Sequence, residues 1–275
     1  AGDKIAYDSI TEVAHHTDDN LPTIKLYKNN TDSKGQSYGA HENYLISRDI
    51  PVEDVASTLL TFFATRIIYT GAGRVGIGVT GEIPGFQISS RADFFERPVG
   101  LETTIRRPIV NTRDEPHANS ERYRRLHVIP ADANLSHYSN LLKFGPATLV
   151  LSAQLPLTED SDSTTKFATA LEIQRAYLNA CKSHEQENPT GVDNDTQQIL
   201  ALWEETLDAL ETNPLALADR LDWVAKYALV SSYVAKGVPY TDAKLKALDI
   251  HYADIDPTRG LYHRLVARGR MCTLF

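Results

Sequence analysis

The sequence has few cysteines, no long apolar run and no excess of positive charge. Among its 275 residues only Cys181 and Cys272 are cysteines. They match no metal-ligand spacing, which favours a reducing compartment over a disulfide framework. No apolar run approaches the roughly 18 residues of a membrane span, and no charged-then-apolar leader opens the chain. These features predict a cytoplasmic protein without a membrane partner.

The charge balance excludes a second class of partner. The formal net charge is −8, whereas proteins that bind nucleic acid usually carry a net basic surface. We therefore expect no nucleic-acid partner, and any local basic cluster needs a local explanation. With 42% hydrophobic residues the chain is able to bury a sizeable core.

Hydrophobic periodicity predicts strands in the first half of the chain. Alternating apolar and polar residues, and short apolar runs between glycines, are typical of strands. The expected strands are 24–28, 41–48, 66–70, 74–79, 86–90 and 125–129, with the runs from 66 to 90 forming an antiparallel series. Pro51, followed by Glu53 and Asp54, predicts one helix from 51 to about 64 in this half.

The second half has the apolar spacing of helices. The expected helices are 167–180, 199–210, 215–234 and a short one ending near Gly269. Asn213 and Pro214 predict a boundary, so we expect a catalytic domain over 1–212 and a small C-terminal domain over 213–275. The polar stretch 156–165 is typical of a mobile linker, or of a junction across an omitted segment.

Arginines gather between positions 106 and 125 of this acidic chain. The planar guanidinium matches phosphate oxygens, so such a cluster beside strands suits a nucleotide triphosphate. The alternative is a solvated loop whose acidic residues pair with the arginines. Arg125 and His127 are two apart on a predicted strand, so both side chains leave the same face.

His41 and Asn43 repeat this geometry on another predicted strand. A histidine on a strand is often a structural residue, and that alternative stays open here. Two strands that each offer a histidine with a polar partner favour a site. No zinc motif of the HExxH or CxxC kind is present, and Mg²⁺ held against phosphates is the metal that suits these residues.

Two other patterns carry less chemistry. Residues 71–76 contain G-x-G-x-x-G, but a strand pattern follows where a dinucleotide fold needs a helix. A glycine-rich hairpin is the better interpretation. Trp223 lies on a predicted amphipathic helix, where a core position is the default and stacking on a base is the alternative.

Six sequence blocks together resemble one known family. They are KNNTD (28–32), SYG (37–39), HENY (41–44), NTRDEPHA (111–118), YRRLHV (123–128) and LDWV (221–224). In this order they resemble the bacterial Pup ligase/depupylase family, whose members are similar to glutamine synthetase and the carboxylate-amine ligases. The resemblance implies an α+β fold: a curved, largely antiparallel sheet that cradles ATP and Mg²⁺, helices behind it, and a small C-terminal domain.

Three further blocks resemble the Pup deamidase/depupylase branch more than the ligase branch. They are 71–76, 99–104 and 260–269. The resemblance implies hydrolysis of the isopeptide bond between Pup and a substrate lysine, and deamidation of the C-terminal glutamine of Pup. Pup and pupylated proteins are then the partners. The alternatives are a Pup ligase and a nucleotide-binding pseudoenzyme with a regulatory role.

The resemblance also implies roles for individual residues. His41 and His127 match metal-site residues, Asn43 and Arg125 match ATP contacts, and Trp223 matches a nucleotide-site residue. To these we add Arg113 and His117 near the phosphates, on charge and placement alone.

The family's metal-binding glutamates and catalytic aspartate come from N-terminal strands whose motifs are absent here, so the catalytic residues stay unknown. We expect a chain that begins downstream of those strands, or a diverged relative that lacks them. We also expect residues 1–275 alone to be inactive, because the metal lacks its carboxylates.

Overall fold

Strands come from the first half of the described chain and helices dominate the second, as the periodicity predicts. The computed structural model describes residues 2–16, 23–32, 34–103, 105–153, 167–188 and 193–274. The expected linker 156–165 lies outside these residues. The strands are β1 (Glu42–Ser47), β2 (Arg74–Ile77), β3 (Ile83–Gln87), β4 (Phe95–Gly100), β5 (Arg107–Asn111) and β6 (Tyr123–Val128).

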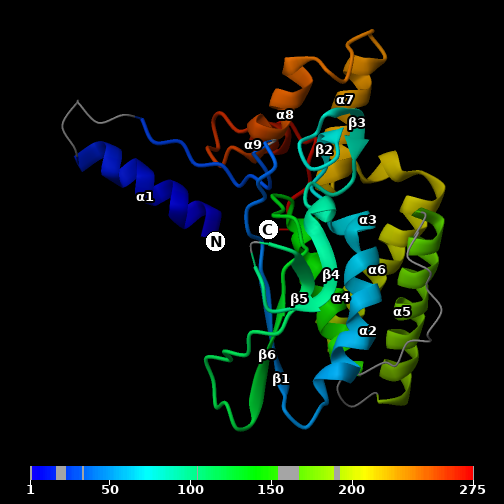
Figure 1. The fold of residues 1–275 in the computed structure, drawn as a ribbon. Coiled ribbons are helices and arrows are strands. Elements are labelled where there is room, and N and C mark those ends of the chain that lie inside the picture. Colours follow the sequence, from blue (N-terminus) through cyan, green and yellow to red (C-terminus); the bar gives the residue numbers. More distant parts are fainter. Residues whose placement is uncertain are drawn as a thin grey trace.

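The described residues also form nine helices (Figure 1). They are α1 (Gly2–His16), α2 (Val52–Thr65), α3 (Ile67–Thr70), α4 (His137–Ala153), α5 (Phe167–Glu187), α6 (Asn194–Thr212), α7 (Asp222–Val234), α8 (Ala243–Ala253) and α9 (Leu261–Ala267), with 3-10 turns at Ala92–Phe94 and Pro214–Leu217. None of the helices in the described ranges is both long enough and apolar enough to cross a membrane.

The main sheet has four strands in the order β1-β6-β5-β4. β6 is antiparallel to both β1 and β5, while β4 is parallel to β5. Two of the three pairings are therefore antiparallel, in agreement with the expected α+β fold. The hairpin β2-β3 is a separate antiparallel sheet, which confirms the hairpin interpretation of the glycine-rich segment.

Two predicted strands are wrong. Residues 67–70 form α3, because the chain continues the helical path of α2: the Arg66 amide donates to Phe62 O, and Ile68 and Tyr69 pack into the core. Residues 24–28 form no strand and make only an isolated bridge between Tyr27 and Asp254. Of the apolar residues of this segment, Leu26 packs against a second hydrophobic cluster, whereas Ile24 and Tyr27 are exposed.

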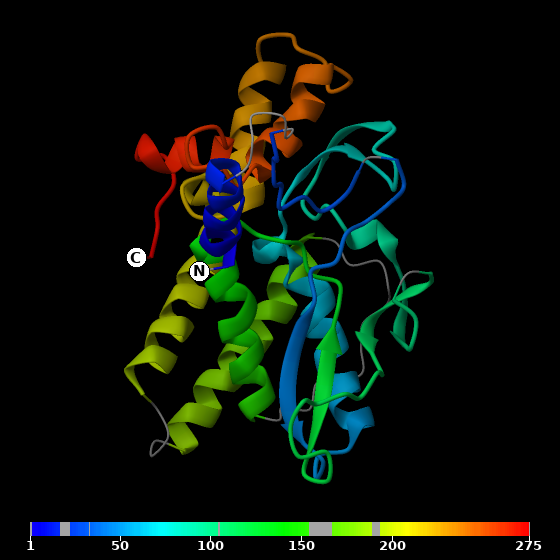
Figure 2. The ribbon, with the colours of Figure 1, turned by 90° about the vertical axis from the view of Figure 1, so that its left-hand side faces the viewer.

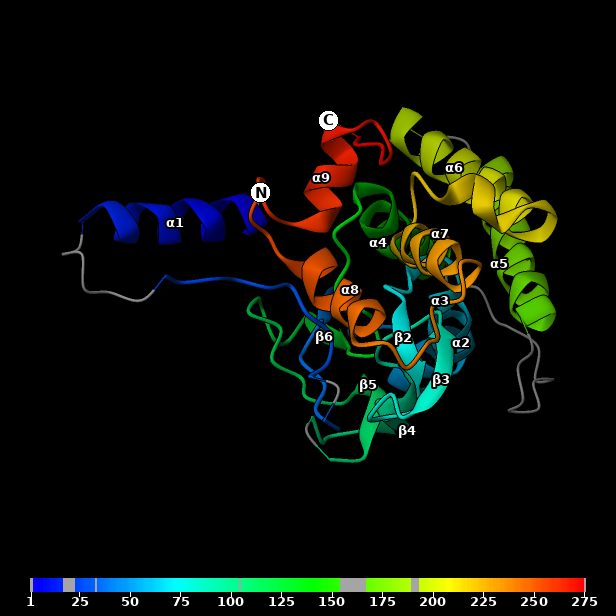
Figure 3. The ribbon, with the colours of Figure 1, turned by 90° about the horizontal axis from the view of Figure 1, so that it is seen from above.

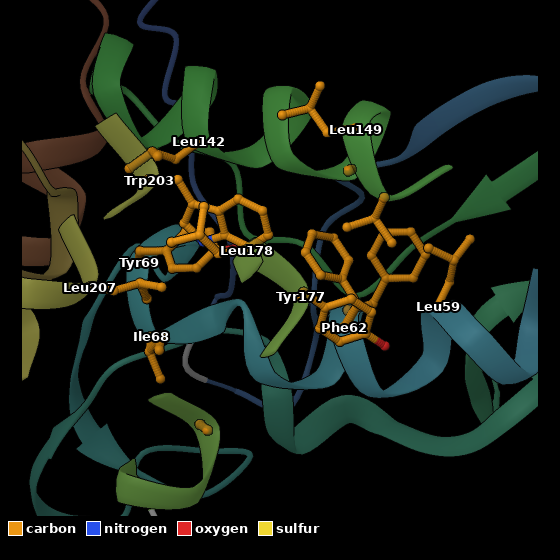
Figure 4. Close-up of a cluster of buried hydrophobic side chains, with 14 of the residues drawn as sticks. Leu59, Phe62, Ile68, Tyr69, Leu142, Leu149, Tyr177, Leu178, Trp203 and Leu207 are labelled. Carbon is orange, nitrogen blue, oxygen red and sulfur yellow. The ribbon is translucent and has the colours of Figure 1, made fainter. Parts of the chain in front are cut away.

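Helices cover one face of the main sheet. Figures 1 and 3 show α2, α4, α5 and α6 stacked on the same side of the strands. The space between them is filled by aromatic rings in edge-to-face contact, with Phe62 centred 5.2 Å from Tyr177 and 6.1 Å from Trp203 (Figure 4). This core holds the sheet rigid from behind.

The opposite face of the sheet is not covered by these helices. Along β1, Glu42 and Ile46 are buried on the helix side, whereas Asn43 and Leu45 are exposed on the other side. Figure 2 looks onto this second face, with β1 and β6 in front. A sheet with one face packed and one face open is the usual arrangement of antiparallel strands.

The C-terminal segment shares its core with the rest of the chain. Leu217, Leu221 and Val224 belong to the main cluster with Phe62 and Trp203. Further along, residues of α7, α8 and α9 form a second cluster together with Leu26 and Leu135. The division at 212/213 stays a prediction.

A buried ion pair joins β1 to the helices behind it. Glu42 Oε1 lies 2.5 Å from Arg66 Nη2, and their side chains are only 2% and 1% exposed. Glu42 Oε2 accepts from Tyr44 OH at 2.6 Å, and Arg66 Nη1 donates to Lys143 O at 2.9 Å. Every charged atom therefore has a partner, which is what makes a buried pair tolerable.

We expect Glu42→Gln to lower the free energy of unfolding by about 3 kcal/mol, because Arg66 stays charged and buried without its counter-ion. Urea unfolding followed by circular dichroism measures this. Glu211→Gln is the matched control: Glu211 pairs with Arg175 at 2.5 Å but is 60% exposed, so its loss costs about 0.5 kcal/mol or less. Equal effects of the two variants would contradict the role given to burial.

Candidate functional site

Strand pairing places the predicted site residues on one face of the sheet. In the β1/β6 register Asn43 is opposite His127 and Leu45 is opposite Arg125. In the β5/β6 register Asn111 is opposite the same His127. Directly opposed residues share a face, so Asn43, His127 and Asn111 form a polar row across three strands.

The two histidines touch each other in front of this row. His127 Nε2 is 3.1 Å from His41 Nδ1, with ring centroids 4.9 Å apart in an edge-to-face arrangement. One of these nitrogens must donate and the other accept, so the accepting ring is neutral. His127 Nδ1 is buried and has no hydrogen-bond partner among the described residues.

Arginines surround the histidine pair. Arg125 donates through Nε and Nη2 to Arg113 O, at 3.3 and 3.0 Å. From other segments, Arg91 Nε donates to Ser37 Oγ at 2.9 Å and Arg107 Nη2 donates to Ser37 O at 3.2 Å. Both arginines thus hold the loop that leads into His41. Arg107 Nη1 is buried and lacks a partner within the described part of the chain.

Burial and the charges of these arginines keep the imidazoles neutral. Burial, then the charge of Arg125, lowers the pKa of His127 to about 4. Burial, then the charges of Arg91 and Arg125, also lowers the pKa of His41. Burial lowers the pKa of Arg91 itself to about 10, so it stays charged at neutral pH. The site therefore combines several fixed positive charges with two neutral imidazoles, and the hydrogen bond between the rings leaves one lone pair free to bind a metal.

The acidic neighbours of the arginine cluster neutralise only part of it. Asp114 pairs with Arg48 at 2.6 Å, and Glu115 is 3.9 Å from Arg125 while 60% exposed. Within the described residues, Arg91, Arg107 and Arg113 form no ion pair with a carboxylate. The solvated-loop alternative thus describes the loop after β5, and the phosphate role of the sheet face stays a prediction.

Five of the seven residues singled out from the sequence lie together: His41, Asn43, Arg113, Arg125 and His127. His117 is exposed on the loop between β5 and β6, with a left-handed φ of 51°. Trp223 lies apart from the sheet face, 7% exposed in the main core, and its indole Nε1 donates to Ile68 O at 2.9 Å. This environment favours the core interpretation of Trp223, and its nucleotide role stays a prediction.

Three site residues were missed by sequence reasoning. Arg107 and Asn111 lie within or beside the arginine-rich blocks, and alternation along β5 could have placed them on the face of His127. Arg91 follows β3 in the short polar run Ser89-Ser90-Arg91, which carries no local signal for a site. Only the tertiary structure brings Arg91 to His41.

The donor set fits a metal in part. Two neutral imidazoles, one with a buried unpartnered nitrogen, are available. The residues that the structure describes contain no group of three or more histidine, cysteine, aspartate or glutamate side chains able to hold an ion. Because Mg²⁺ prefers oxygen ligands, these histidines can supply only a part of its coordination shell.

A polar cavity of about 360 Å³ lies elsewhere in the described structure, and none of the histidines or arginines of the sheet face lines it. Charged groups from α7, α8 and β2 line it, including Lys226, Asp249 and Arg74. Tyr38, three residues before His41, forms part of its wall. The volume lies within the range of about 300–1,000 Å³ that is usual for small-ligand pockets.

We expect His127 to titrate near pH 4 in an NMR titration, and Arg125→Gln to raise its pKa, because a neighbouring positive charge is removed. Arg122→Gln is the control, since Arg122 is an exposed residue of the same segment that does not act on His127. A folded pKa below the unfolded value of about 6.5 means that stability is lost as the pH falls from about 6.5 towards 4. A His127 pKa unchanged in Arg125→Gln would contradict this account.

Known proteins share the sequence blocks of this chain over most of its length. The sequence profile of the Pup-ligase protein family matches residues 1–156 and 152–275. The chain is 46% identical over 276 residues to the depupylase of Acidothermus cellulolyticus, covering 90% of this chain and 55% of that protein. It is 42% identical to the Pup deamidase/depupylase of Mycolicibacterium smegmatis with the same coverage, and 39% identical to the Pup–protein ligase of Corynebacterium jeikeium, covering 91% and 62%.

Two solved structures have the same fold. The Pup ligase PafA in complex with ADP superposes with a TM-score of 0.82 at 32% identity, covering 100% of this chain and 66% of that one. PafA in complex with Pup gives a TM-score of 0.84 at 33% identity, covering 100% and 61%. The chain spans about half the length of the curated depupylases it matches. With its sequence matched by the family profile and relatives 46% and 42% identical over 90% of its length, the chain belongs to the Pup-ligase protein family.

Proposed function

We propose that this chain supplies the nucleotide-phosphate site of an ATP- and Mg²⁺-dependent depupylase. The reaction is hydrolysis of the isopeptide bond between Pup and a substrate lysine, together with deamidation of the C-terminal glutamine of Pup. The observation that carries the proposal is the positive sheet face, where Arg91, Arg107 and Arg125 surround two neutral histidines.

The charge pattern suits the phosphates of a nucleotide. Arg107 Nη1 and His127 Nδ1 are buried without partners in the described ranges, and a buried polar atom without a partner costs stability unless a ligand satisfies it. Guanidinium groups donate to phosphate oxygens in a fixed planar geometry. We assign the phosphate contacts to Arg125 and Arg113, with Asn43 beside them on β1.

The histidines hold the metal in this proposal. His41 and His127 are neutral at physiological pH, so no proton has to leave before they bind an ion. When bound, Mg²⁺ neutralises charge on the phosphates and polarises the oxygens it touches. The arginines have a second task, since positive charge held in place stabilises the negative charge that develops on an attacked amide carbonyl.

A depupylase is favoured over a ligase by sequence similarity. The two curated depupylases share 46% and 42% identity with this chain, against 39% for the ligase of Corynebacterium jeikeium. The ligase is the second candidate, because both matched structures are PafA ligases with TM-scores of 0.82 and 0.84. Pup and pupylated proteins are the proposed partners in either case, and the cytoplasm is the proposed location.

We expect residues 1–275 to bind ADP in the presence of Mg²⁺, and Arg125→Gln to weaken the affinity about tenfold, because charge-assisted bonds to phosphate are lost. Isothermal titration calorimetry measures both. Arg175→Gln is the control: Arg175 pairs with Asp208 and Glu211 on the helical side, away from the sheet face. Absence of ADP binding by the unmodified chain would overturn the proposed site.

A hybrid enzyme separates the two candidate activities. The chain replaces the matching segment of the Acidothermus cellulolyticus depupylase, which leaves the rest of that enzyme to complete the active site. We expect the hybrid to release free Pup from a pupylated protein, and Arg125→Gln in the hybrid to slow release by about 100-fold or more.

The same hybrid is given Pup ending in glutamate, ATP and a lysine-bearing protein. Formation of conjugates without release of Pup would favour the ligase. Two reference reactions accompany it: the hybrid with Arg175→Gln, expected to keep full activity, and residues 1–275 alone, expected to cleave nothing.

A further inference from the structure

Asp132 is a buried residue whose carboxylate connects its own segment of the chain to two others. It is 2% exposed and follows β6. Its Oδ2 accepts from Ala72 N at 2.7 Å and Ser90 N at 2.8 Å, and its Oδ1 accepts from Arg91 N at 3.0 Å and Ser89 Oγ at 3.1 Å. Four donors thus replace water around one negative charge, and they come from the turn after α3 and the segment after β3.

The backbone of Asp132 is held just as firmly. Lys143 of α4, 4% exposed, donates from Nζ to Asp132 O at 2.6 Å. The position of the carboxylate is therefore set by the helical layer behind the sheet. The bonds to the Asp132 carboxylate and the bond from the Lys143 ammonium each involve one charged group, and such hydrogen bonds are stronger than those between neutral groups.

The segment that contains Asp132 accepts hydrogen bonds from both the amide and the guanidinium of Arg91. Its amide donates to the Asp132 carboxylate, and its guanidinium Nη1 donates to Ile129 O at 3.1 Å and also to Ala131 O. From this position the Arg91 charge acts on His41. The direction of the guanidinium depends on how the main chain is held at 89–91.

We propose that Asp132 is a positioning residue that acts through Arg91: it fixes the segment 89–91 so that the Arg91 guanidinium lies against Ser37, in the loop that leads into His41, and contributes to binding the nucleotide phosphates. The role in phosphate binding rests on the function proposed above. Asp132 itself touches neither histidine, and its hydrogen bonds go only to the framework.

Asp132→Asn is the direct test, because it keeps the shape of the side chain and replaces one carboxylate oxygen, an acceptor, by an NH₂ group, a donor. The asparagine amide NH₂ then faces N–H donors in place of an acceptor, so the bonds to one oxygen are lost and donors oppose each other. Asp222→Asn is the matched control. Asp222 is 0% exposed and accepts from Ser136 N, Asn134 Nδ2 and Tyr252 OH, without touching Arg91.

Arg91 can be followed without any nucleotide. Phenylglyoxal modifies accessible arginines, and mass spectrometry locates the adducts. In the unmodified chain Arg91 is expected to be protected, as is the internal reference Arg66, since they are 2% and 1% exposed. Asp132→Asn is expected to speed modification of Arg91 about tenfold or more through local opening, with Arg66 and the Asp222→Asn chain unaffected.

Ser89→Ala gives a milder variant in case Asp132→Asn does not fold. It removes one of the four bonds to the carboxylate, and an intermediate rate of Arg91 modification is expected. Protection of Arg91 in both variants would overturn the positioning role. So would equal exposure of Arg66, or equal exposure of Arg91 in Asp222→Asn, because either result means general loosening.

ADP affinity then tests the functional consequence. Asp132→Asn is expected to bind ADP·Mg²⁺ about tenfold more weakly than the unmodified chain, and Asp222→Asn within about twofold of it. Unchanged affinity alongside an exposed Arg91 would overturn the link to the site. If the unmodified chain binds no ADP, the proposed function fails, and with it the link to phosphates, whereas the arginine labelling still decides whether Asp132 positions Arg91.

Discussion

The antiparallel register between β1 and β6 is the constraint on which the site depends. It sets Asn43 opposite His127 and Leu45 opposite Arg125, which brings two distant sequence blocks onto one face. A slip of one residue would turn every one of these side chains towards the helices. The buried pair of Glu42 and Arg66 opposes such a slip, because only the inner face of β1 can reach the arginine between α2 and α3.

Several arginine charges lie on the sheet face, and hydrogen bonds to main-chain carbonyl oxygens stabilise them. The guanidinium groups nearest the histidines donate to carbonyl oxygens: Arg125 to Arg113 O, Arg107 to Ser37 O, and Arg91 to Ile129 O. Such bonds stabilise each cation without cancelling its charge. Positive potential is thereby concentrated at the sheet face, and burial together with this potential lowers the pKa of both imidazoles.

The helical second half serves this face indirectly. The aromatic core around Phe62 and Trp203 supports the sheet from behind, and Lys143 of α4 carries that rigidity to Asp132. Membership of the Pup-ligase family, shown by sequence, agrees with an architecture in which one half of the chain presents charges and the other holds them still. Sites that bind phosphates in fixed geometry depend on such support.

The sequence by itself determined which strand residues share a face, because side chains alternate along a strand whatever its neighbours are. His41 with Asn43 and Arg125 with His127 were predictable for that reason. Apolar spacing predicted α5, α6, α7 and α9, whereas α4 and α8 were not among the predicted helices. The tertiary structure alone decided that 67–70 continues a helix. It also decided that Arg91 and Asp132, 41 positions apart, meet at the site. Local patterns carry no information about such contacts, since these depend on how separate segments pack and not on the order of residues within any one of them.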